Sequence, residues 1–324
     1  MPLHLLTSLD GEIAFDVDPE VVPVAAGPTR IAEGVTSDDA RSLARAATFL
    51  LGTFEERRAG AAATIRPRLL DSREQTGQRW CEEVAPLVAS ERFLPLERSD
   101  PDGTARAVGV VAAATAWLGD LEGRTVALGS FDRVARAVAA EAVRRGARVV
   151  AVATERGAVA RSEGFEPVEL EDARSEHGPS LVHHLDLEVH PARDVHELRV
   201  DVLVPAMRVG VIDHELAPRI QARVVVPAHL VPCTGRGLDA LRAARTTVLP
   251  DIVCAGGALL AHQTSPALTP AEALARVERE VGERITAARL AKVDPVRHAT
   301  MLADTFLTTW LPPEHRPDAA AVAP

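Results

Sequence analysis

The chain has 324 residues and a net charge of −10 at pH 7; 47% of its residues are hydrophobic and 25% are charged. This composition is typical of a globular protein long enough for two domains, and the negative charge argues against a nucleic-acid surface, which needs clustered cations. Neither a signal peptide nor a membrane span is evident, and three cysteines are too few for a disulfide framework, so we expect a cytoplasmic protein. The chain has a single lysine, Lys292.

The first third of the chain predicts strands followed by helices. Residues 11–31 alternate loosely between apolar and polar side chains and are interrupted by prolines, which is typical of short strands. Thr36 precedes a serine and two aspartates, a pattern that satisfies the free N–H groups of a helix start. Apolar residues then recur at helical spacing as far as Phe54, and Gln75–Val88 predicts a weaker second helix.

From Leu121 the pattern changes to strands alternating with helices. Residues 124–129 and 147–153 are short apolar runs on either side of a predicted helix over Asp132–Arg145, and together they indicate a β-α-β unit. Further apolar runs lie at 201–205, 223–227 and 246–249, and helices are predicted at 271–291 and 298–310. Short apolar strands separated by helices predict an α/β fold with a parallel sheet covered on both faces.

Three short motifs carry a family resemblance. They are Gly-Pro-Thr-Arg at 27–30, Asp-Val-Leu-Val-Pro-Ala at 201–206, and Leu-Pro-Asp-Ile at 249–252 followed by Ala255-Gly256-Gly257. These motifs resemble the Glu/Leu/Phe/Val amino-acid dehydrogenases, most closely the shorter, leucine-type members. The resemblance implies an N-terminal αβ domain (1–118), a doubly wound Rossmann-like domain (119–295), and a C-terminal segment (296–324) whose helix returns to the first domain.

The chain departs from the family where the family performs its chemistry. The family's lysine that binds the substrate carboxylate corresponds to Leu50 in this chain. The family's glycine-rich loop and catalytic lysine correspond to the stretch 59–62, with Ala62 as its last residue. The catalytic aspartate falls in the stretch Glu97-Arg98-Ser99, with Arg98 in place of the acid. Arginine does not substitute for a catalytic lysine, because its pKa is too high for it to act as a base.

The dinucleotide site is altered in the same way. The glycine fingerprint corresponds to residues 130–135 and loses its glycines, although Gly129 precedes it. Asp132 places a carboxylate where a phosphate would sit, and it is equally a normal helix N-cap. We therefore expect NAD(P) binding to be weakened or lost. The residues of this altered cofactor site are Gly129, Ser130, Phe131, Asp132, Arg133, Thr154 (at the ribose-binding acid) and Glu155.

Other side chains leave alternatives open. His229 and Cys233, with Glu97, are candidates for new acid–base or nucleophilic groups, and the expected substrate cleft contains Arg30, Leu50, Ala62, Cys254 and Gly256. The cysteine and histidine spacing matches no metal motif, so we expect no metal. The histidines between 183 and 190 alternate with apolar residues, which favours the polar face of a strand near a sheet edge over a metal site.

Two functional hypotheses follow. In the first, the protein is a non-catalytic relative that acts as a binding or partner subunit, with itself or with an active dehydrogenase. In the second, the cleft has been reused for an enzymatic reaction on an amino-acid or imine-like metabolite. The first accounts for the simultaneous loss of substrate and cofactor groups. By analogy with the family and with soluble oligomers in general, we expect a homodimer.

Overall fold

The computed structural model describes residues 1–68, 72–263 and 268–318, which form two compact units. One unit contains residues 1–99 together with the segment that starts at Ala299, and the other contains Asp100–His298. Helix α3 (Thr104–Leu118) belongs to the second unit, because it packs against α4 (Arg133–Arg144) and α9 (Pro270–Ala291). The second unit thus begins at Asp100, earlier than the expected domain start at residue 119.

The first unit is built on a six-stranded sheet, ordered β1-β2-β5-β3-β6 with β4 also paired to β5. Its strands are β1 (Leu3–Leu5), β2 (Asp10–Phe15), β3 (Ala25–Gly27), β4 (Thr29–Ile31), β5 (Ala59–Arg66) and β6 (Leu94–Pro95). The strands expected within 11–31 are confirmed. The central strand β5 was not predicted, because its run of alanines and a glycine has low intrinsic strand propensity.

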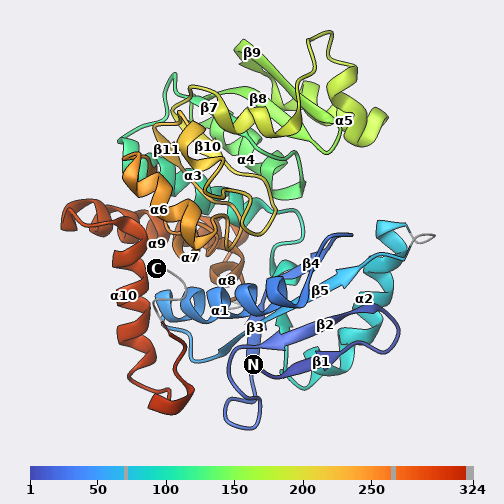
Figure 1. The fold of residues 1–324 in the computed structure, drawn as a ribbon, viewed down its shortest axis with the longest axis vertical. Coiled ribbons are helices and arrows are strands. Elements are labelled where there is room, and N and C mark those ends of the chain that lie inside the picture. The colour runs from blue at the N-terminus through green and yellow to red at the C-terminus, as the bar shows by residue number, and fades with distance from the viewer. Residues whose placement is uncertain (69–71, 264–267, 319–324) are drawn as a thin grey trace. The chain divides into compact units, whose positions relative to one another are not determined.

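Helices cover both faces of this sheet (Figure 1). Helix α1 (Ser37–Thr53) starts at Thr36 with a capping box, as expected, and lies so close to β5 that a Cβ on Gly60 would be 2.1 Å from the carbonyl oxygen of Ala44. Helix α2 (Arg73–Ala89) covers the other face, where Trp80 joins a core with Ile13. Helix α10 (Pro295–Leu307) also contacts α1, and the 3₁₀ turns of this unit are η1 (Leu96–Ser99) and η5 (Pro313–His315).

The second unit has the doubly wound sheet that the strand pattern predicts. Its order is β12-β11-β10-β7-β8-β9, and every pairing is parallel except the antiparallel edge strand β9. The strands are β7 (Thr125–Leu128), β8 (Arg148–Thr154), β9 (Gly157–Phe165), β10 (Val202–Val204), β11 (Val224–Val225) and β12 (Thr247–Val248). The remaining helices are α5 (Pro167–His177), α6 (Gly235–Ala243), α7 (Asp251–Cys254) and α8 (Gly257–His262), with 3₁₀ turns η2 (Gly178–His183), η3 (Ala192–Glu197) and η4 (Ala217–Arg219).

The histidine-rich segment corrects one expectation. Instead of an edge strand over 183–190, the chain forms η2 up to His183 and then bends, and only an isolated bridge joins His190 to Ala158. Pro179 near the start of η2 favours a helical turn, and the buried Leu181 turns into the core. The imidazoles of His177 and His184 stack 3.6 Å apart.

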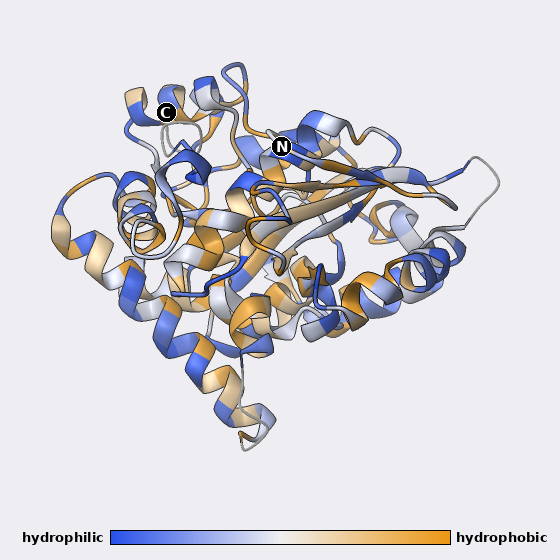
Figure 2. Cartoon of the chain, turned by 90° about the horizontal axis from the view of Figure 1, so that it is seen from below, coloured by the Kyte–Doolittle hydropathy of each residue, from blue (hydrophilic) through white to orange (hydrophobic). Residues whose placement is uncertain are grey.

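Hydropathy follows this architecture. The long helices alternate between hydrophilic and hydrophobic along their length, as amphipathic helices do (Figure 2). Within the described residues, no helix combines the length and the apolar character needed to cross a membrane.

Candidate functional site

The turn between β7 and α4 lies at the carboxyl end of the parallel strands, where doubly wound sheets bind ligands. Gly129 begins this turn, and its N–H donates to the carbonyl of Val204 at 2.7 Å. A Cβ at Gly129 would lie 2.4 Å from the Ala206 nitrogen and 2.7 Å from Nε2 of His196. The close approach of β7 to the end of β10 therefore requires a glycine at this position.

His196 completes the packing around Gly129 as a neutral side chain. Burial lowers the pKa of this imidazole, which is 3% exposed. Its Nε2 accepts the N–H of Ala206 at 3.3 Å, so Nδ1 carries the proton and donates to the carbonyl of Arg193 at 3.0 Å. Both ring nitrogens are thus used in holding the loop after β10.

Asp132 occupies the N-terminus of α4. Its Oδ1 accepts the backbone N–H groups of Val134 and Ala135 at 2.8 and 3.1 Å, and its Oδ2 accepts the Ser130 hydroxyl at 2.7 Å. A helix N-terminus attracts anions because its free N–H groups and its dipole both point outward. In this chain the first-turn donors already bind the protein's own carboxylate, and the adjacent Phe131 is buried.

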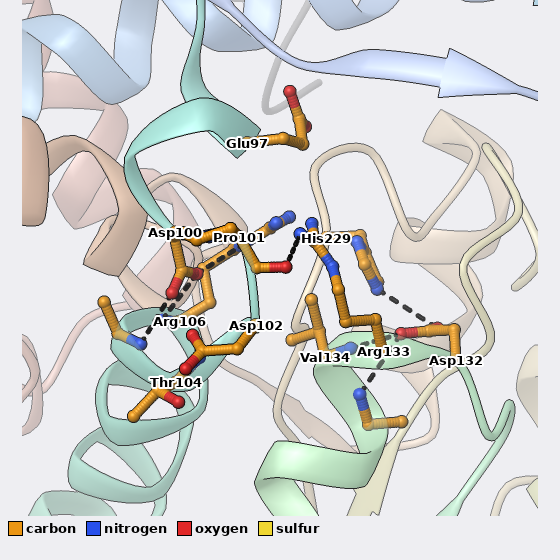
Figure 3. A network of polar contacts seen from close by, with 12 residues as sticks. Glu97, Asp100, Pro101, Asp102, Thr104, Arg106, Asp132, Arg133, Val134 and His229 are labelled. Atoms are coloured by element: carbon orange, nitrogen blue, oxygen red, sulfur yellow. Dashed lines mark hydrogen bonds and ion pairs between the residues drawn. The ribbon is translucent and has the colours of Figure 1, made fainter. Parts of the chain in front are cut away.

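His229 faces the same carboxylate from the loop after β11 (Figure 3). Its Nε2 is 3.4 Å from Oδ2 of Asp132, within ion-pair distance but outside hydrogen-bond geometry, and both side chains are less than one-fifth exposed. Burial by itself raises the pKa of Asp132, but the charge of His229 and the hydrogen bonds outweigh it and hold the pKa well below its usual range. Asp132 is therefore ionised at neutral pH.

The loop that carries His229 is held by Asp251. Oδ2 of Asp251 accepts the Val231 N–H at 2.7 Å, and Val231 has a φ of +56°, a conformation that a β-branched residue rarely adopts. Burial raises the pKa of Asp251, and burial together with the neighbouring Asp251 raises the pKa of the Cys233 thiol to about 12. Burial also raises the pKa of Cys254. Both thiols are protonated at neutral pH, which argues against either as a nucleophile.

A second polar group lies in the loop before α3 and closes against the start of α4 (Figure 3). Asp100, which is 2% exposed, accepts the N–H of Ala105 at 2.8 Å and pairs with Arg106 at 3.3 Å. The Arg133 guanidinium donates to the carbonyl of Pro101. Sequence reasoning missed this loop, although Asp-Pro-Asp-Gly-Thr at 100–104 combines acids and turn formers before a helix.

The ribose-side position is also engaged within the protein. Thr154 ends β8, and its hydroxyl donates to the carbonyl of Pro179 at 2.7 Å and accepts the N–H of Arg156 at 3.1 Å. Glu155 is exposed in the tight turn into β9. The antiparallel β8–β9 hairpin was not expected from the sequence, and it turns the chain back directly after Thr154, the residue expected at the position of the ribose-binding acid.

The candidate residues of the first unit lie in its sheet and helix α1. Leu50 and Ala62 are at most 1% exposed, and Arg30 is half-buried on β4. Glu97 accepts the N–H of Thr29 at 3.1 Å, so its carboxylate holds the start of β4.

A buried polar network joins α1 to the sheet. Asp16 accepts the Thr48 hydroxyl at 2.7 Å and pairs with Arg45 at 2.8 Å, and the Thr48 hydroxyl also accepts the N–H of Gly60 at 3.0 Å. Each polar group in this network therefore has a partner from the protein itself.

The structure places some of the predicted site residues in contact with one another and others in separate parts of the fold. Asp132 and His229 form a pair that the sequence did not indicate, because they are nearly a hundred residues apart. Cys254 and Gly256 lie in the α7–α8 region, where the neighbouring Gly257 would place a Cβ 2.1 Å from the Ala105 carbonyl. Among the described residues, no group of three or more His, Cys, Asp or Glu side chains is arranged to hold a metal ion.

Comparisons of the sequence and of the structure with known proteins point to the same family. A sequence profile described as Glutamate/Leucine/Phenylalanine/Valine dehydrogenase matches residues 98–264, just over half of the chain. A glutamate dehydrogenase from Aeropyrum pernix is 33% identical over 184 residues, which cover 55% of this chain and 44% of that protein. The match thus spans less than half the length of that relative.

Solved structures extend the likeness to almost the whole chain. One is a hetero-hexameric glutamate dehydrogenase from Thermus thermophilus, described as a Leu-bound form. The superposition covers 91% of this chain and 82% of that chain, with a TM-score of 0.73 and 24% sequence identity. Another is an L-tryptophan dehydrogenase from Nostoc punctiforme. Its superposition covers 95% of this chain and 96% of that chain, with a TM-score of 0.56 and 15% sequence identity. At these identities the structures show a shared fold.

Proposed function

The chain belongs to the Glutamate/Leucine/Phenylalanine/Valine dehydrogenase family, and we propose that it has lost NAD(P)-dependent oxidative deamination and acts as a non-catalytic binding or partner subunit. The family chemistry, as the resemblance implies it, needs a base that can lose a proton, an acid that relays protons and a nicotinamide that accepts hydride. The proposal is that all three requirements have lapsed while the fold has been kept.

The observation that carries the proposal is the carboxylate at the start of α4. A dinucleotide pyrophosphate would need the N–H groups of Val134 and Ala135, which bind Asp132. A phosphate placed beside the ionised carboxylate would be repelled by roughly 1–4 kcal/mol, at effective dielectrics between those of water and a protein surface. Moving Asp132 away would sacrifice its pairing with His229 and the Ser130 hydroxyl.

The substrate side supports the same proposal. Leu50 and Ala62 match the family's two lysines, and both are apolar and buried. Neither position provides a cation for an amino-acid carboxylate or an amine for proton transfer. Glu97 and Arg30 remain as polar groups on or beside β4, and they are our proposed contacts for a small amino-acid-like ligand that is bound without being turned over.

Assembly is the second part of the proposal. The Thermus thermophilus structure is described as hetero-hexameric and Leu-bound. We propose, by this analogy, that the chain assembles with itself, as a dimer or a larger ring, or with an active dehydrogenase, in the cytoplasm. Its role would then be to support or regulate its partner.

The direct test is an activity assay of the purified chain with glutamate, leucine, valine, phenylalanine and tryptophan, each with NAD⁺ and with NADP⁺. We expect no reduction of either cofactor above a blank without protein. Turnover at an ordinary enzymatic rate with any of these substrates would refute the loss of activity. A catalytic relative that retains the family lysines, assayed in parallel, provides the positive control.

One observation favours a second candidate, an enzyme with a reused site. Asp132 and His229 form a largely buried ionisable pair at the ligand-binding edge of the sheet, an environment common among catalytic groups. If an amino acid or imine is turned over, His229→Asn should abolish turnover at a temperature below the unfolding midpoint of the variant, which the loss of the ion pair with Asp132 is expected to lower. Retained turnover in this variant would exclude the pair as the reacting group.

A further inference from the structure

A basic pocket of about 370 Å³ lies in the second unit beside β12. It is formed where the C-terminal ends of α3, α6 and α9 meet, and residues 292–295 close it. Its charged and aromatic lining consists of Trp117, Arg242, Arg245, Arg289, Lys292 and Asp294. This volume is within the range of small-molecule sites. None of these residues belongs to the turn between β7 and α4.

Most of the cationic charge in the pocket is uncompensated. Arg242 pairs with two carboxylates, Asp294 at 3.1 Å and Asp239 at 3.3 Å, and Asp294 also accepts the N–H of Arg297. Across residues 1–68, 72–263 and 268–318, Arg245, Arg289 and Lys292 make no ion pair. Within the same described residues, their side chains make one hydrogen bond, a long one of 3.4 Å from Arg289 to the Trp117 carbonyl. Three exposed cations without an ion pair among the described residues thus line one concave site in a chain whose net charge is −10.

The dipoles of the three helices offset part of the positive charge in the pocket. Cations are favoured at helix C-termini, and each terminus carries roughly half a negative charge. Three converging termini offset about 1.5 charges, whereas Arg245, Arg289 and Lys292 supply three. A positive excess therefore remains for a ligand.

Two of the cations stand at positions that glycine would suit better. Arg245 and Lys292 follow α6 and α9 with φ values of +59° and +55°, the left-handed conformation that usually selects glycine or asparagine at a helix end. Lys292 is also the only lysine of the chain. Long cationic side chains at two strained positions facing one pocket indicate a function beyond helix termination.

We propose that this pocket binds a small organic compound that carries a di- or triphosphate group. A single carboxylate would leave two of the three cations without a partner, whereas two linked phosphates carry about three negative charges at neutral pH. Arginine forks suit phosphate oxygens, and Trp117, Val248 and Pro295 provide an apolar wall for the organic part. The proposal is independent of whether the turn before α4 binds a dinucleotide.

The test is isothermal titration of the full chain with pyrophosphate and with inorganic phosphate at low ionic strength. We expect pyrophosphate to bind more tightly than phosphate, and the double variant Arg245→Gly/Lys292→Gly to weaken pyrophosphate binding by about ten-fold or more. Arg57→Gln, an exposed arginine of the first unit without an ion pair among the described residues, is the matched control and should leave binding unchanged.

Stability separates loss of the site from loss of the fold. Glycine relieves the left-handed backbone at both positions, so the thermal unfolding midpoint of the double variant should be equal to or higher than that of the unmodified chain. The proposal is overturned if the unmodified chain does not bind pyrophosphate, or if the double variant binds it equally well. It is also overturned if Arg133→Gln, at the start of α4, is the change that weakens binding.

Discussion

The positions that we propose to be closed to ligand differ between the two units in the interactions that occupy them. In the first unit, the resemblance aligns Leu50 and Ala62 with the family's lysines, and both side chains are buried in the apolar packing of α1 on an alanine-rich strand. In the second unit, the helix N-terminus is filled by the charge of Asp132, held by backbone N–H groups and His229. Packing is insensitive to pH and salt, whereas a paired carboxylate is not. The comparison therefore predicts different responses to substitution.

Restoring a lysine in the first unit should have the largest effect. Leu50→Lys places an ammonium in an apolar site that is 1% exposed, and we expect it to lower the free energy of unfolding by about 4 kcal/mol. Urea denaturation measures the change. Leu50→Met, which keeps the volume and polarity, should cost less than about 1.5 kcal/mol. A stable lysine variant would show that the position is open to ligand instead of closed by packing.

Tight packing of α1 predicts a large effect at Gly60. A Cβ in Gly60→Ala would lie 2.1 Å from the Ala44 carbonyl and 2.3 Å from the Thr48 nitrogen, and both are backbone atoms that cannot rotate away. We expect a loss of about 3 kcal/mol in denaturant unfolding.

The matched control for Gly60 is Gly77→Ala on α2. A Cβ at Gly77 meets no atom within 4 Å, so this change should be neutral or stabilise by up to about 1 kcal/mol. Equal effects of the two alanines would contradict close packing between α1 and β5.

The charge in the second unit predicts a pH-dependent effect. Asp132→Ala removes a buried helix cap and leaves His229 unpaired, and should cost about 2 kcal/mol at pH 7. The folded-state pKa of Asp132 lies below its unfolded value, so its stabilisation is present above about pH 4 and is lost as the pH falls through the lowered folded-state pKa. The stability difference between the unmodified chain and Asp132→Asn should therefore shrink from pH 6 to pH 3.

That difference is the informative measurement, because other carboxylates with lowered pKa values, such as Asp102 and Asp201, titrate in the same range in both proteins. A difference that stays constant with pH would mean that Asp132 is not held as an ion. It would also remove the contrast between the two units.

The smallest effect is expected at the ribose-side position. Thr154→Val removes the hydroxyl that contacts the Pro179 carbonyl and the Arg156 N–H, and should cost about 1 kcal/mol in thermal or urea unfolding. Because the hydroxyl is used internally, NADH titrations of this variant and of the unmodified chain should agree. A change in affinity would place a ribose at Thr154.

Sequence patterns located the elements that have strong local signals. Thr36 with its following acids fixed the start of α1, and apolar runs located the parallel strands of the second unit. Strand β5 was not predictable, because Ala59–Ala63 becomes a strand through its three paired neighbours and not through its own propensity. The apolar helix α3 was likewise missed, since residues 105–114 are buried on all sides and show no amphipathic period.

The site was predicted only residue by residue. Asp132 was identified as a helix cap and His229 as a candidate acid–base group, each from its local motif. Their pairing depends on the order of β7 and β11 in the sheet, which no local pattern specifies. The pKa of Cys233 likewise depends on burial and on the distant Asp251. The Asp132–His229 pair and the raised pKa of Cys233 could therefore be identified only from the three-dimensional structure.

We propose that the start of α4 is closed to a dinucleotide by its own carboxylate. The most direct measurement is calorimetric titration of the unmodified chain and of Asp132→Gly with NADH and NADPH. We expect no detectable binding to the unmodified chain, and measurable binding to the variant, whose Val134 and Ala135 N–H groups become free. Tight binding of either cofactor to the unmodified chain would contradict it.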